Sequence, residues 1–442
     1  MLNKLQNNIL IGGILMFLFL AALIADRSIN LMSLSVLIAF ITQMALMIYY
    51  SRPDHTNYSE RALFFTVLIY TLLLGVFDML VCEYYEGDNY MFSKQDALFY
   101  LHESTHAANL GLAEGIKYFA ERYEFDDWGA LVFDMLVMYV LPSKLFLNAI
   151  YTVLGAISAV YIYRIGKPYM PEVHAFLASL AYATSSYMIF FNCSFLKESL
   201  FIFLVISTFY HFYNAINNHS QESFVVIGVC IVIMFFFRPA VSAFIGASIF
   251  AYYALQMKGH AVSLFLYGII AVGGVISMQI MQSNLDRYAV NGDMGATLEY
   301  RAVTNYSTGF NYFVSYFGAV CGPFPTLFPK SPDNHSLLEY YGAGLTYRLF
   351  LIIPFWASLY YAWKNKVVAF LPLIIFILME MVSTAFIYAS LELRKVLLHI
   401  PFMYILSFYG LKYIQQGKLN FMLGMPTYAM AIGILYLWNI IK

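Results

Sequence analysis

Long apolar runs recur along almost the entire chain, separated by short polar turns. A bilayer core about 30 Å thick needs roughly 20 apolar residues to be crossed by one helix. The runs that meet this length are 9–25, 32–50, 62–82, 143–163, 173–191, 198–216, 223–238, 240–256, 262–281, 346–363, 368–388, 396–412 and 420–441. The pattern predicts an all-α polytopic integral membrane protein with about 12–13 transmembrane helices. We expect one membrane domain, residues 1–442, and read the first run as a span and not as a cleaved signal peptide.

Two long segments, 83–142 and 282–345, interrupt this pattern. The first carries 11 of the 25 acidic residues, and the second is rich in Tyr, Gly and Pro. Apolar residues recur at helical spacing within the first segment, as at Leu98, Leu101 and Leu112. We therefore expect amphipathic helices there that lie on the membrane surface.

The distribution of basic residues predicts the orientation. If the N-terminus is cytoplasmic, one set of turns holds Arg52, Arg61, Arg164, Lys167, Lys258, Lys364, Lys366, Lys412 and Lys418. The opposite short turns hold fewer basic residues, which fits the excess of Lys and Arg in cytoplasmic loops. Both long segments then lie on the outer side, and the short cytoplasmic turns leave no room for a nucleotide-binding domain.

Composition narrows the classes of function. Hydrophobic residues make up 61% of the chain and charged residues 11%, with a net charge of -1. This balance gives no general attraction to nucleic acid. The four cysteines are scattered without the spacing of a thiolate metal site. Abundant Tyr and Phe suit membrane interfaces and sugar-stacking surfaces equally.

Several charged residues interrupt or border the apolar runs on the predicted outer side. The cationic ones are Lys197, Arg238, Arg287, Arg301, Arg348, Arg394 and Lys395. Fixed Arg and Lys donors at the headgroup level are suited to holding a phosphate or pyrophosphate of a polyprenyl lipid. The alternative for each residue is a cation that reaches to the interface and anchors its helix.

Two acidic residues fall deeper within apolar runs, Glu380 in 368–388 and Asp78 near the outer end of 62–82. An intramembrane carboxylate is costly and points to function. The alternative is a buried carboxylate that bonds a neighbouring helix.

A combination of short motifs carries a resemblance to a known superfamily. Asp96 and Tyr100 follow an early span, Lys197-Glu198 head a Leu/Phe-rich helix, and Arg238-Pro239 open a later one. Over about 62–260 this arrangement resembles the membrane-embedded GT-C glycosyltransferases and the Wzy-type O-antigen and capsule polymerases. Two extra spans precede the usual first one, and neither the GT-C acid pair nor the Arg-x10-Gly motifs of some polymerases is present.

The resemblance implies transfer of a glycan from an undecaprenyl-phosphate or undecaprenyl-pyrophosphate carrier, on the periplasmic side of a bacterial inner membrane. The cations would stabilise the leaving phosphate. Asp96 is the first candidate for the base and Glu198 the second, while Tyr100 and His102 would contact substrate. The expected partners are an undecaprenyl-linked oligosaccharide, membrane lipid and other polysaccharide-assembly membrane proteins, and no cofactor is expected.

The preferred function is a repeat-unit polymerase of a surface polysaccharide. The alternatives are a GT-C enzyme that adds one sugar from a polyprenyl-phosphate monosaccharide, and a transporter of lipid-linked glycan. A further alternative is a zinc protease, because the run 102–106 satisfies His-Glu-x-x-His. His102 and His106 would then bind zinc from one helix face, with a third ligand from Glu114, Glu121 or Glu124.

Overall fold

The computed structural model describes residues 31–52, 54–55, 58–87, 94–256, 337–383 and 397–415, together with scattered positions in 6–21. In these ranges the chain forms helices and no strand. The elements are α2 (Leu31–Tyr50), α3 (Glu60–Glu86), α4 (Lys94–Leu110), α5 (Leu112–Arg122), η1 (Phe125–Asp127), α6 (Trp128–Val140), α7 (Lys144–Gly166), α8 (Glu172–Ala183), α9 (Ser186–Cys193), α10 (Glu198–Asn218), α11 (Gln221–Phe235), α12 (Pro239–Gln256), α16 (Leu337–Lys364), η3 (Val368–Phe370), α17 (Leu371–Ser383) and α19 (Ile400–Gln415).

The fold class predicted from the sequence is confirmed: the protein is all-α and polytopic. Three described helices, α3, α7 and α10, are long and apolar enough to cross a bilayer, and α8 with α9 makes a fourth if the bent pair is one span. Shorter apolar helices lie at four further predicted spans, 32–50, 223–238, 240–256 and 368–388. The runs 262–281 and 420–441 lie outside the described residues, so the count of 12–13 stays a prediction.

The predicted span 173–191 is not one continuous helix. α8 and α9 meet at an angle of 54°. The break falls at Thr184-Ser185, where both hydroxyls donate to backbone carbonyls of the preceding turn, at 2.7 Å to Leu180 and 2.6 Å to Tyr182. Hydroxyl side chains that bond the backbone in this way compete with the helical ladder and bend it.

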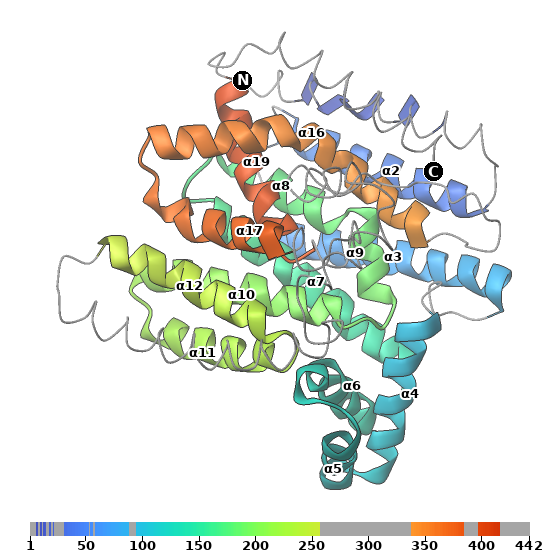
Figure 1. The fold of residues 1–442 in the computed structure, drawn as a ribbon. Helices are drawn as coiled ribbons and strands as arrows, with labels where there is room; N and C mark the ends of the chain where they lie inside the picture. The colour runs from blue at the N-terminus through green and yellow to red at the C-terminus, as the bar shows by residue number, and fades with distance from the viewer. Residues whose placement is uncertain are drawn as a thin grey trace, which may run out of the picture.

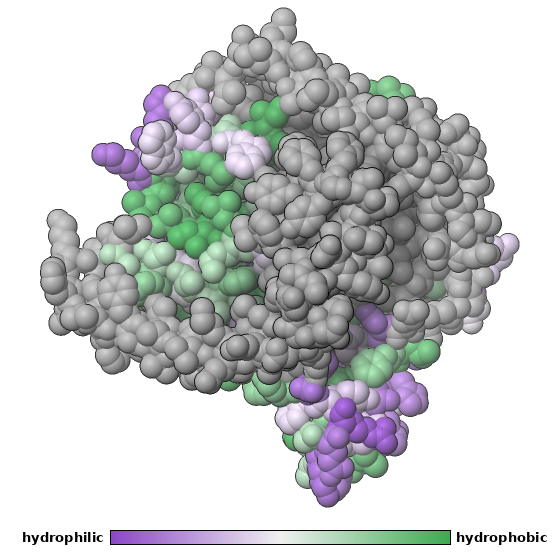
Figure 2. Space-filling model, in the orientation of Figure 1, coloured by the Kyte–Doolittle hydropathy of each residue, from purple (hydrophilic) through white to green (hydrophobic). Residues whose placement is uncertain are grey.

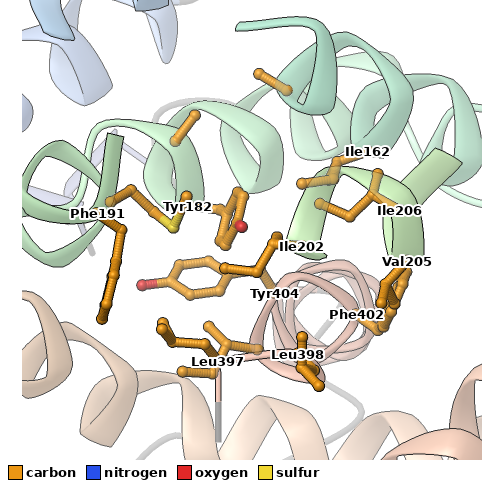
Figure 3. Packing of buried hydrophobic residues seen from close by; sticks show 14 of the residues in the cluster. Ile162, Tyr182, Phe191, Ile202, Val205, Ile206, Leu397, Leu398, Phe402 and Tyr404 are labelled. Carbon is orange, nitrogen blue, oxygen red and sulfur yellow. The ribbon is translucent and has the colours of Figure 1, made fainter. Parts of the chain in front are cut away.

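The centre of the bundle is built from large side chains of helices far apart in sequence (Figure 3). Tyr182 of α8 lies against Tyr404 of α19, with ring centroids 6.1 Å apart. Ile202 and Ile206 of α10 lie beside them in the same cluster. Between helices in a membrane such close packing is the main cohesive force, because lipid tails are as apolar as the side chains themselves.

α16 and α19 approach one another closely at Gly410. A side chain added to Gly410 would place its Cβ 2.9 Å from the carbonyl carbon of Pro354 and 3.0 Å from the amide nitrogen of Ser358. Only a residue without a side chain permits this contact, which is how small residues bring membrane helices together.

The turns predicted to be cytoplasmic meet at one end of the bundle. Arg164, at the end of α7, binds both carboxylate oxygens of Glu60 at the start of α3, at 2.8 and 2.6 Å. The same guanidinium donates to the hydroxyl of Tyr210, in the second half of α10. α10 has 21 residues and is therefore about 30 Å long. Its first residue, Glu198, thus lies at the opposite end of the bundle.

At that opposite end, α4, η1, α5 and α6 form a unit that projects from the bundle, here called the projecting unit (residues 94–140; Figure 1). Its helices pack mainly on one another. Figure 2 shows hydrophilic residues concentrated on this unit, and hydrophobic ones over the described bundle near α17. The unit occupies the first long segment in which sequence predicted amphipathic helices, and their contact with the membrane surface stays a prediction.

Candidate active site

The structure brings together four charged residues and a tyrosine, from four separate parts of the chain, where the projecting unit meets the bundle. Lys197 Nζ lies 3.4 Å from Asp127 Oδ1 and 5.7 Å from the centre of the Tyr100 ring. Arg238 Nη2 lies 3.9 Å from Glu198 Oε1. These five residues are here called the Lys197–Arg238 site. Lys197, Glu198, Arg238 and Tyr100 were predicted from sequence, whereas Asp127 was not.

Asp127 was missed because its local pattern is weak. It ends η1 immediately before the apolar helix α6, in an acidic segment with many other candidates. The adjacent acids Asp126-Asp127 at the edge of an apolar run are the only sequence signal that singles it out. Its side chain is 48% exposed, so it can reach both Lys197 and solvent.

Lys197 is placed by an unusual turn between α9 and α10. Phe195, two residues earlier, has a φ of 57° and is fully buried. A bulky residue in the left-handed region is strained, and such positions occur where surrounding packing enforces them. The turn delivers Lys197 to the start of α10 with its side chain only 14% exposed.

The environment of Lys197 keeps it charged. Burial acts to lower the pKa of the ammonium group, and repulsion from Arg238 acts in the same direction. Attraction to Tyr100, Glu198 and Asp127 outweighs both, and the pKa of Lys197 is raised above its ordinary value. A raised lysine pKa means that Lys197 is protonated at every physiological pH.

Arg238 is held from several directions. Glu198, whose side chain is 2% exposed, faces its guanidinium, which also lies 5.7 Å from the ring centre of Phe201. Glu380 of α17 is buried and close enough to Arg238 to interact with it electrostatically. The deep acid noted in the sequence thus lies within electrostatic range of Arg238. Asp78, by contrast, accepts a hydrogen bond from Ser35 of α2. This contact fits the alternative considered for Asp78, a buried carboxylate that bonds a neighbouring helix.

Tyr100 links the projecting unit to this site. Burial raises the pKa of its phenol, with Lys197 acting in the opposite direction. Tyr100 therefore stays neutral and can act as a hydrogen-bond donor. Asp96 lies one turn earlier on α4, and residues four apart share a helix face. Asp96 thus lies on the same face of α4 as Tyr100.

Five further cations were predicted from the sequence. Arg287, Arg301, Arg394 and Lys395 lie outside the described residues. Arg348 belongs to α16, of which only the backbone is described at that position.

The His-Glu-x-x-His run lies on α4, where Glu103 holds α5 in place. Glu103 Oε2 accepts hydrogen bonds from the hydroxyls of Tyr118 and Tyr123, both at 2.7 Å. His102 is 73% exposed, with Nδ1 3.2 Å from Glu103 Oε1, and His106 lies against the ring of Tyr118. Within the described ranges, no three His, Cys, Asp or Glu side chains are grouped to hold a metal ion.

Comparison with known proteins relates part of the chain to one protein family. A search of curated proteins found no match. Residues 127–285 match the family model described as dolichyl-phosphate-mannose-protein mannosyltransferase, over less than half of the chain. The match begins at Asp127 and contains Lys197, Glu198 and Arg238. It supports, for the part of the chain that forms the site, a membrane glycosyltransferase of the GT-C type.

Proposed function

We propose that the protein transfers a single sugar from a polyprenyl-phosphate carrier to a hydroxyl group, at the Lys197–Arg238 site. The observation that carries the proposal is the meeting of two cations with two carboxylates, Asp127 and Glu198, inside the segment that matches the mannosyltransferase family, beside the phenol of Tyr100 from the preceding helix α4. The family is named for dolichyl-phosphate mannose, a polyprenyl-type phosphate bonded to one sugar. For this reason we place single-sugar transfer ahead of the repeat-unit polymerisation favoured by sequence.

The proposed reaction exchanges one bond at the anomeric carbon. The acceptor oxygen forms a bond to that carbon, and the bond to the phosphate oxygen breaks, so that the phosphate leaves with the electron pair. Lys197 and Arg238 stabilise the charge that grows on the leaving phosphate. The acceptor hydroxyl gives its proton to a carboxylate.

The carboxylates of the site have different surroundings, which suggests different roles. Asp96 remains the first candidate for the base, since it shares a face of α4 with Tyr100. Glu198 was the second candidate, but its burial beside Arg238 favours a role in holding that guanidinium. Asp127 would hold Lys197 in the same way until phosphate binds.

The proposal includes a location. If the N-terminal side of α3 is cytoplasmic, the Lys197–Arg238 site faces the periplasm of a bacterial inner membrane. The donor is then an undecaprenyl-phosphate sugar drawn from the outer leaflet, with membrane lipid and polysaccharide-assembly membrane proteins as neighbours. No nucleotide is needed for such a donor.

Product analysis tests the proposed function. Membrane vesicles containing the full chain are supplied with undecaprenyl-phosphate monosaccharides, radiolabelled in the sugar, and the products are separated by size. Addition of one labelled residue per acceptor supports the proposal. A ladder of repeat units formed from lipid-linked oligosaccharide would instead favour the polymerase, and movement of lipid-linked glycan without a new glycosidic bond would favour a transporter.

The zinc alternative has its own measurement. Metal analysis of the purified protein is compared with a His102→Ala/His106→Ala variant. Stoichiometric zinc that is lost together with a proteolytic activity in the variant would replace the glycosyltransferase proposal. Glycosyl transfer that is unchanged by chelation and by the double substitution would support it.

A further inference from the structure

The projecting unit has a direct backbone connection to the turn that carries Arg238. The Gly129 N–H donates to the Phe236 carbonyl at 2.9 Å. Gly129 is the second residue of α6, and the first four N–H groups of a helix have no acceptor within the helix. The start of α6 is therefore completed by the turn between α11 and α12.

The same contact leaves no room for a side chain. A Cβ added to Gly129 would lie 2.7 Å from Cγ of Phe237 and closer still to two other atoms of that ring. Phe237 is buried, and its ring stacks on Phe201 with centroids 5.3 Å apart and planes inclined by 2°. Because the Phe237 ring is buried and stacked on Phe201 of α10, it has little freedom to give way to a methyl group at position 129.

Each side of this contact is adjacent in sequence to a residue of the Lys197–Arg238 site. Asp127 lies two residues before Gly129, and Arg238 directly follows Phe237. A second contact runs parallel to the first, since Phe125 of η1 stacks on Phe235 of α11 at 5.6 Å. The distance between the projecting unit and the cations is thus fixed by packing next to the charged residues themselves.

We propose that Gly129 and Phe237 are positioning residues: they form a joint that fixes the projecting unit, with Tyr100 and Asp127, against the helix ends that carry Lys197 and Arg238. The expected loss of activity rests on the proposed function. The expected change in the distance between the projecting unit and the bundle does not. A misplacement of about 1 Å in an active site can reduce the rate by about 100-fold. Gly129→Ala should therefore lower kcat by about 10- to 100-fold. It should change KM less, because the side chains that bind the sugar donor and the acceptor remain present.

The mechanical part is tested by a distance measurement on the full chain in lipid bilayers. Spin labels are attached to cysteines at Glu114, exposed on α5, and at Val225, 68% exposed on α11, in a background where the four native cysteines are replaced by alanine. Double electron–electron resonance then gives the distribution of distances between the two labels, one on the projecting unit and one on α11. Gly228→Ala is the matched control, because a Cβ there meets no atom within 4 Å.

With the joint intact, the parent and Gly228→Ala should give the same narrow distribution, and Gly129→Ala a shifted or clearly broader one. Adding Phe237→Ala to Gly129→Ala removes the ring that the new methyl group meets, and should move the mean distance back towards that of the parent while the distribution stays broader. If Gly129→Ala does not accumulate as folded protein, Phe237→Ala alone replaces it, and a broader distribution is expected. A narrow, unshifted distribution in the variant measured overturns the proposal. Absence of glycosyl transfer in the parent would refute the proposed function and leave this measurement valid.

Discussion

Removal of either cation of the Lys197–Arg238 site should abolish most of the activity without unfolding the protein. We consider Lys197→Met first, because methionine keeps much of the volume of the lysine stem and removes only the charge. Lys197 lies 3.4 Å from Asp127, which at an effective dielectric constant of about 20 corresponds to about 5 kcal/mol between unit charges. Since Asp127 is half-exposed, solvent screening reduces the net value of this pair well below that figure.

A phosphate that binds Lys197 would gain a comparable interaction, and the gain increases as negative charge develops on the leaving oxygen. Loss of one such donor typically lowers the rate by about 10²–10³-fold, or about 3–4 kcal/mol of transition-state stabilisation. We expect this loss in kcat/KM for Lys197→Met and for Arg238→Met. Because Arg238→Met removes the guanidinium 3.9 Å from the buried Glu198, Arg238→Met/Glu198→Gln should fold better than Arg238→Met while remaining as inactive.

The assay combines rate and binding. Initial rates of sugar transfer are measured in membrane vesicles, and undecaprenyl phosphate is added to purified protein to follow the rise in Tm that a bound ligand produces. Lys364→Met, an exposed lysine at the opposite end of the bundle, is the matched control and should behave as the parent. If Lys197→Met and Arg238→Met both retain rates and Tm shifts within twofold of the parent, the proposed phosphate site is wrong.

Two further predictions concern stability. Gly410→Ala should separate α16 from α19 and lower the Tm. Gly228→Ala is the control and should leave the Tm unchanged, because a Cβ at that position has open space around it. An unchanged Tm in Gly410→Ala would contradict the close packing of α16 on α19. Burial acts to raise the pKa of Glu103, but hydrogen bonds, chiefly from Tyr118, lower it below the ordinary 4.5. A depressed carboxyl pKa stabilises the fold above the unfolded value and loses that contribution as the pH falls through the folded value. The protection factors for hydrogen exchange in α4 and α5, which correct for the slower intrinsic exchange at low pH, should thus fall below pH 4.5. Glu103→Gln should lower them at neutral pH as well, and unchanged protection in that variant would show that these bonds do not hold α5.

Much of the fold was predictable from sequence, because hydropathy is a local property. The positions of α3, α7, α10 and α12 follow from apolar runs long enough to cross or nearly cross a bilayer. The break between α8 and α9 was not predicted, since the run 173–191 meets the length and hydropathy of one span despite Thr184, Ser185 and Ser186 near its middle. It depends on hydroxyl side chains, whose choice between solvent and backbone carbonyls is decided by their surroundings.

The candidate site was predictable only in part. Lys197 and Arg238 were identifiable because a charge beside an apolar run is costly and therefore conspicuous. Their partners were not: Asp127 lies 70 residues from Lys197 in sequence, and the acidic segment around it offers many equivalent carboxylates. The cations outside the described residues remain predictions.

The sequence by itself determined that this protein is a helical membrane protein, and it singled out Lys197 and Arg238 as cations beside apolar runs. Only the tertiary structure decided which of those charges meet, and that Gly129 and Phe237 set the spacing between them. The reason is that the pattern along a helix states which residues avoid water but not which neighbour they face. That choice is made by the packing of side chains between helices distant in sequence.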